Sequence, residues 1–170
     1  MISDRQRPST IKDSDLDAFL MKYELVELKE TKIAGFVART SNSSPDMGAV
    51  IGGTWKRLFS EGGYSSIPNK TTGKTMGIYT DYEGDEHGEY TFMAGCAVDG
   101  DVPDGFNVRT LPAGKYAKFV VIGNMMTAVG EFWKELWKMC LDRTFVFDFE
   151  EYQNADPDNC EIHIYIGVKG

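Results

Sequence analysis

The sequence predicts an α+β protein in which two strand–helix–strand–strand units form one curved antiparallel sheet carrying two helices. Two segments, 47–59 and 126–140, repeat apolar residues at the three- and four-residue spacing of a helix. Shorter segments rich in β-branched and aromatic residues accompany each of them in the same order. We expect a central cleft between the two helices, on a pseudo-twofold axis, where a ligand site is natural.

The main domain is expected to span residues 23–170. Residues 1–22 mix charges with Ser, Thr and one Pro, and predict a tail that ends in a short helix after Ser14. The segment 23–39 then predicts a strand interrupted by a polar kink at residues 29–32.

The rest of the first unit consists of the helix at 47–59 and two strands. A pair of glycines soon after residue 59 is expected to end this helix. The strands are predicted at 75–81 and 89–98, and an acidic loop, 82–88, joins them.

The second unit repeats this order. An interrupted strand is predicted at 106–122, broken by a Pro-Ala-Gly sequence, and the helix at 126–140 follows. Strands at 145–153 and 161–168 end the chain. Residue identity between the halves is slight, so we infer a duplication of structure rather than of sequence.

Composition limits the partners and the compartment. The net charge of −8 repels nucleic acid and anionic membranes and attracts cations, so direct DNA binding is not expected. No segment approaches the roughly 18 apolar residues of a membrane span, and the N-terminus is too polar for a signal peptide. Three widely spaced cysteines suggest reduced thiols. We therefore expect a cytoplasmic protein.

Motifs for metals and cofactors are absent from the sequence. Gly73-Lys74-Thr75 resembles the end of a phosphate-binding loop, but Pro68 stands at the required upstream glycine. Two histidines exclude a multi-histidine metal site. His87, in the acidic loop, is either part of a solvated turn or a catalytic or haem-binding residue. We expect no metal and no cofactor.

One carboxylate stands out near the end of the chain. In a strand, Glu150 and Tyr152 point to the same side, and His163 and Tyr165 share a side of the last strand. If both sides face the cleft, the carboxylate stands among tyrosines, a combination suited to an apolar cation. Alternatively, Glu150 lies on the surface of an edge strand, and His163 is a structural histidine.

Six short segments appear in a characteristic order: 23–26 with 32–36, 76–79, 93–98, 111–117, 149–152 and 161–166. In this order they resemble the GyrI-like effector-binding family. That family includes drug-sensing domains of AraC- and MerR-type transcription regulators and free-standing gyrase-modulating proteins. No helix-turn-helix accompanies the segments, so we expect a free-standing member.

The resemblance implies the residues of a ligand pocket. Glu150 is implied as its acid, Tyr79 and Tyr165 as ring walls, and Trp55 and Trp133 as its sides. Alternatively, the tryptophans are core residues, because both lie on the apolar stripes of the helices. In many relatives a second acid stands at the position of His163, which is one of two departures from the family pattern. The other, more important departure is that no helix-turn-helix accompanies the domain.

Three functions follow as hypotheses. The first is a binder of lipophilic, cationic aromatic compounds such as drugs or dyes, acting by sequestration or by signalling to a protein partner. The second, implied by the superfamily, is a hydrolase of electrophilic molecules, with Glu150 as general base and Tyr152 or Tyr165 as general acid. The third, implied by the gyrase-modulating relatives, is an interaction module whose acidic surface, above all the loop 81–89, binds a basic protein. We favour the binder, and no feature of the sequence demands an enzyme.

Overall fold

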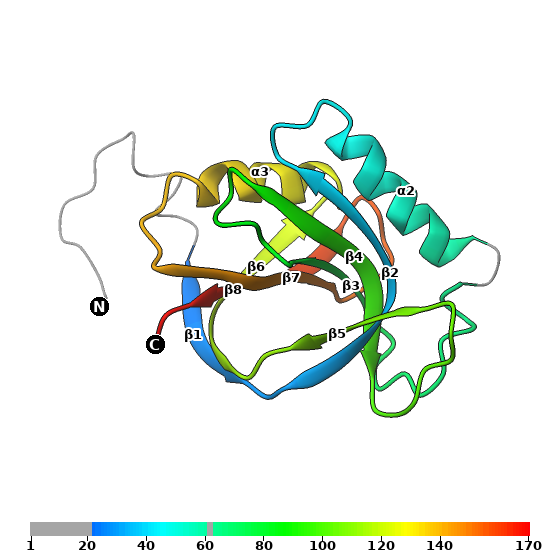
Figure 1. Cartoon of the computed structure of the whole chain (residues 1–170). Helices are drawn as coiled ribbons and strands as arrows, with labels where there is room; N and C mark the ends of the chain where they lie inside the picture. The colour runs from blue at the N-terminus through cyan, green and yellow to red at the C-terminus, as the bar shows by residue number, and fades with distance from the viewer. Residues whose placement is uncertain (1–21, 61–62) are drawn as a thin grey trace.

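Eight strands form one antiparallel sheet in the order β1-β6-β8-β7-β3-β4-β2-β5, and two helices lie on it (Figure 1). The computed structural model describes residues 22–60 and 63–170. The predicted N-terminal tail and short helix therefore lie outside the described residues, except for Lys22. No helix in the described ranges is long and apolar enough to cross a membrane.

The predicted order of elements is confirmed in both units. The first unit contains β1 (Tyr23–Leu28), β2 (Thr31–Ser41), α2 (Met47–Phe59), β3 (Thr75–Thr80) and β4 (Glu89–Val98). The second contains β5 (Asn107–Leu111), β6 (Gly114–Gly123), α3 (Thr127–Leu136), β7 (Arg143–Tyr152) and β8 (Cys160–Val168).

The two interruptions predicted in the first strand of each unit let the units exchange strands. β1 pairs with β6 of the second unit, and β5 pairs with β2 of the first. Pro112 lies at the second interruption, where it has no ladder hydrogen bond to donate. In the centre of the sheet β3 pairs with β7, so the pseudo-twofold axis passes between these two strands.

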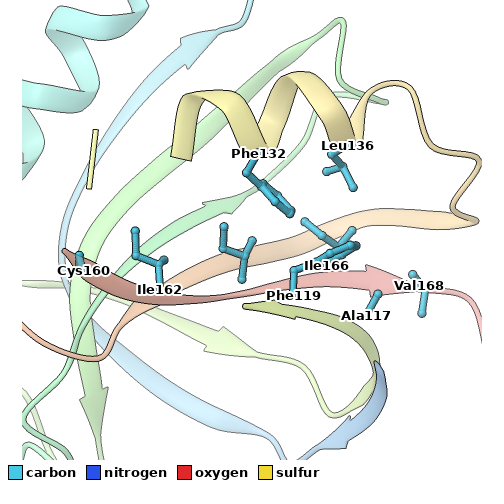
Figure 2. Close-up of a cluster of buried hydrophobic side chains, with 9 residues drawn as sticks. Ala117, Phe119, Phe132, Leu136, Cys160, Ile162, Ile166 and Val168 are labelled. Atoms are coloured by element: carbon cyan, nitrogen blue, oxygen red, sulfur yellow. The ribbon is translucent and has the colours of Figure 1, made fainter. Parts of the chain in front are cut away.

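Both helices lie on the same side of the sheet (Figure 1). Under α3, Phe132 and Leu136 point toward the strands and pack on Ile162, Ile166 and neighbouring apolar residues (Figure 2). Helix α3 is shorter than predicted, because its last turn tightens. Past Leu136 the amide of Met139 donates to the carbonyl of Leu136 at 2.9 Å, an i to i+3 bond.

A second apolar cluster fills the other face of the sheet. Its buried members are Ile33, Met76, Ile78, Met93, Leu111, Tyr116, Phe147 and Phe149. Neighbouring residues of a strand point to opposite faces, so the residues of β7 belong alternately to this cluster and to the helix-covered face. Phe149 thus points away from the helices and Glu150 toward them.

A cavity between the helices with a buried carboxylate

A cavity of about 1060 Å³ lies on the helix side of the sheet. This is slightly above the roughly 300–1,000 Å³ typical of small-molecule pockets. Its lining comes from α2, α3 and the central strands, and includes Ile51, Trp55, Phe59, Tyr79, Val129, Trp133, Trp137, Glu150 and Tyr152. The predicted central cleft is therefore present.

Glu150 lies in the floor of this cavity and is only 1% exposed. Its Oε2 accepts hydrogen bonds from the Tyr79 hydroxyl at 2.8 Å and from the Trp133 indole at 3.1 Å. Its Oε1 accepts one from the Tyr152 hydroxyl at 2.8 Å. Three neutral donors from β3, α3 and β7 thus hold one carboxylate.

Gly77 makes room for this carboxylate. It is the direct partner of Glu150 in the β3–β7 ladder. A Cβ at residue 77 would stand 2.9 Å from Oε1 of Glu150 and 3.0 Å from the ring of Trp55. A side chain at this position would have to push aside the carboxylate or the indole, so the glycine gives both of them room.

The residues around Glu150 are arranged about the pseudo-twofold axis. Tyr79 lies two residues after Gly77, and Tyr152 lies two residues after Glu150. Because Gly77 and Glu150 are antiparallel partners, the two tyrosines lie on the same face and on opposite sides of this pair. Two tyrosines at equivalent positions therefore share a single acid.

The two helices also share a sequence motif, which the comparison of whole halves missed. Both have Met-x-x-x-(Ile/Val)-Gly-x-x-Trp-Lys-x-Leu followed by an aromatic residue, at 47–59 in α2 and at 125–137 around α3. Trp55 and Trp133 occupy the same place in the motif. An alignment limited to the two helical stripes would have revealed it.

The charge of Glu150 has no basic partner among the described residues, since no Lys, Arg or His there forms an ion pair with it. Burial raises the pKa of Glu150, while hydrogen bonds from Tyr152, Tyr79 and Trp133 act to lower it. Burial and the nearby charge of Glu150 raise the pKa of both tyrosines well above the ordinary value. Both hydroxyls therefore stay protonated as donors at neutral pH.

Aromatic rings surround the carboxylate. Tyr79 meets Trp133 edge-on with ring centroids 5.0 Å apart, and Tyr152 meets Trp55 edge-on at 5.4 Å. Phe59 stacks on Trp55 at 5.9 Å. Five of the seven predicted site residues, Glu150, Tyr152, Tyr79, Trp55 and Trp133, are thus brought together at one cavity.

Tyr165 and His163 are not brought to the cavity. In the β7–β8 ladder Tyr165 is opposite Phe149, and His163 is opposite Glu151. Opposite residues share a face, so both point away from Glu150. Tyr165 stacks on Phe149 at 4.6 Å, and the His163 ring lies 2.6 Å from the carboxylate of Glu161. The expectation that both strand sides face the cleft was wrong, because the sequence did not define the register between β7 and β8.

A second buried carboxylate on β7 was missed. Asp148 is fully buried, and its Oδ2 meets Arg143 at 2.9 Å and accepts from the Tyr82 hydroxyl at 2.5 Å. Its Oδ1 accepts from the backbone amide of Gly167 at 2.9 Å. The ladder between β7 and β8 shifts register between residues 143 and 148, and Phe145 has φ 53°. The only sequence signal for this buried site is that Asp148 lies two residues before Glu150, on the same side of the strand.

Comparisons with known proteins agree with this architecture. A Bacillus subtilis (strain 168) protein named as a transcriptional regulator, YobU, is 33% identical over 155 residues, which cover 85% of this chain and 96% of the relative. The structure of a Vibrio cholerae integron cassette protein has a TM-score of 0.68 and 27% identity, covering 86% of this chain and 95% of that one. SAV2435, solved with bound tetraphenylphosphonium, has a TM-score of 0.74 and 24% identity, covering 88% of this chain and 95% of its own.

The model of the integron-associated effector-binding family, Cass2, matches residues 24–168. This match confirms the resemblance to effector-binding proteins and assigns small-molecule binding as the general function. The chain belongs to the integron-associated effector-binding protein family.

Proposed function

We propose that the protein binds a lipophilic aromatic cation in the cavity, with Glu150 as the counter-charge. One observation carries the proposal. A carboxylate that is 1% exposed faces an aromatic cavity and has no basic partner among the described side chains.

A cation is favoured over a neutral ligand by the energetics of burial. An ionised carboxylate removed from water is costly unless an opposite charge lies close to it. The three donors around Glu150 are neutral, so they offset only part of that cost. A cation in the cavity offsets more of it, and the faces of Trp55 and Trp133 add cation–π attraction.

Two further facts support this ligand class. The net charge of −8 attracts cations from solution. SAV2435, a protein of the same fold, is bound to tetraphenylphosphonium, which is a cation with four aromatic rings. Tetraphenylphosphonium is therefore a suitable probe for the cavity.

The proposal is tested by titrating the protein with tetraphenylphosphonium and following the fluorescence of the cavity tryptophans. We expect Glu150→Gln to weaken binding by roughly 1–3 kcal/mol, the scale of a hydrogen-bonded or partly desolvated charge. Glu151→Gln is the matched control, because Glu151 follows in sequence and points to the other face of β7.

Unchanged affinity in Glu150→Gln would remove this residue from the site. Equal weakening by Glu151→Gln would show an effect of net charge instead of a contact in the cavity.

A further inference from the structure

Each helix has a glycine at the same place of the shared motif. Gly52 precedes Trp55 by three residues in α2, and Gly130 precedes Trp133 by three residues in α3. Both glycines line the cavity. Along a helix, residues three apart lie on one face, so each glycine stands beside the tryptophan of its own helix.

Neither the backbone conformation nor the packing of the described residues requires these glycines. Glycine inside a helix destabilises the folded state relative to alanine. Neither residue has a positive φ, and a Cβ built on either meets no heavy atom of the described residues within 4 Å. Gly77 is different, because atoms of the site already occupy the space its side chain would need. The space beside Gly52 and Gly130 belongs to the cavity.

We propose that Gly52 and Gly130 set the size of the ligand by leaving room on both sides of Glu150. The ligand class is then a wide cation whose charge lies near its centre and whose aromatic groups reach both helices. This inference rests on the proposed function and adds two specificity-determining positions to it. Gly53 supplies the control, since it lies in the same helix, does not line the cavity and also has open space at its Cβ.

The test compares a wide and a narrow cation, tetraphenylphosphonium and phenyltrimethylammonium, in fluorescence titrations of the full chain. We expect Gly52→Leu and Gly130→Leu each to lower the affinity for tetraphenylphosphonium at least tenfold. Affinity for phenyltrimethylammonium is expected to stay within threefold, and Gly53→Leu is expected to change neither. Leucine is a good helix former, so the variants should unfold at the same or a higher temperature.

The outcomes separate the two proposals. If the wild-type protein binds both cations and the leucine variants keep their ratio of affinities, this inference is overturned and the proposed function stands. If Gly53→Leu acts like the cavity variants, the effect comes from the helix and the inference also fails. If the wild-type protein binds neither cation, the proposed function and the inference fail together.

Should either leucine variant not fold, Gly52→Ala and Gly130→Ala replace them. Each added methyl group is expected to lower the affinity for tetraphenylphosphonium about threefold more than the affinity for phenyltrimethylammonium. Equal effects on the two cations would contradict the inference.

Discussion

Two buried carboxylates stand two residues apart on the same face of β7, and they have opposite surroundings. Asp148 forms an ion pair with Arg143, whose side chain is 8% exposed. It also accepts a hydrogen bond from the backbone amide of Gly167. Glu150 accepts hydrogen bonds from three neutral donors and borders a cavity. The first charge is compensated within the chain, whereas the second has no basic partner among the described residues. Asp148 is thus expected to serve stability and Glu150 to serve binding.

The largest expected effect is on the stability of the Asp148 site. Asp148→Asn leaves Arg143 buried without its counter-charge, which costs about 3–5 kcal/mol in the free energy of unfolding. Glu150→Gln removes a buried charge that has no basic partner among the described residues, and the free energy of unfolding at pH 8 is expected to stay equal or to rise. Chemical denaturation of both variants measures the difference. Equal losses would show that the two carboxylates have the same role.

A smaller effect is expected when one donor to Glu150 is removed. Tyr152→Phe keeps the ring and deletes the hydroxyl, so the ionised carboxylate loses one hydrogen bond and holds its proton more tightly. We expect cation affinity to fall by about 0.5–1.5 kcal/mol at pH 7, and by more at pH 6.

The control for this variant is Tyr165→Phe. Tyr165 was also a predicted pocket residue, but it stacks on Phe149 at the other face of the sheet. Titrations with tetraphenylphosphonium compare the affinities of both variants, and we expect only Tyr152→Phe to bind it more weakly. Weakening by Tyr165→Phe alone would contradict the assignment of the cavity face.

The smallest effect is the pH dependence of stability without ligand. Burial raises the pKa of Glu150 in the folded state above its ordinary value of 4.5. The stability contributed by the protonated group is therefore fully present below about pH 4.5 and is lost as the pH rises through the folded pKa. The melting temperature of Glu150→Gln minus that of the wild type should increase across this range. A difference that is flat, or that grows toward acid, would contradict the raised pKa.

Much of the fold was predictable because its elements carry local signals. The apolar stripes of α2 and α3 and the interruptions of the first strands determined the order of elements and the duplication. The end of α3 was predicted too far along the chain. The apolar stripe continues past Leu136, but the backbone there tightens into i to i+3 bonds, which periodicity does not reveal.

The site was predictable up to the register of the strands. Two-residue alternation placed Glu150 and Tyr152 on one face, and the resemblance added Tyr79 and the two tryptophans. The face of Tyr165 depends on which residue of β7 lies opposite it, and that pairing is a long-range property. The ion pair of Asp148 also depends on an irregular segment that brings Arg143 back to it.

The most direct test of the account compares two molecules of nearly the same size and opposite charge, tetraphenylphosphonium and tetraphenylborate. The melting temperatures of the wild type and of Glu150→Gln are measured with each of them. We expect tetraphenylphosphonium to stabilise the wild type, and the variant to lose most of this shift. Tetraphenylborate is expected to have no stabilising effect on the wild type. Equal stabilisation by both ions, or a shift unchanged in Glu150→Gln, would contradict the role of Glu150 as counter-charge of a bound cation.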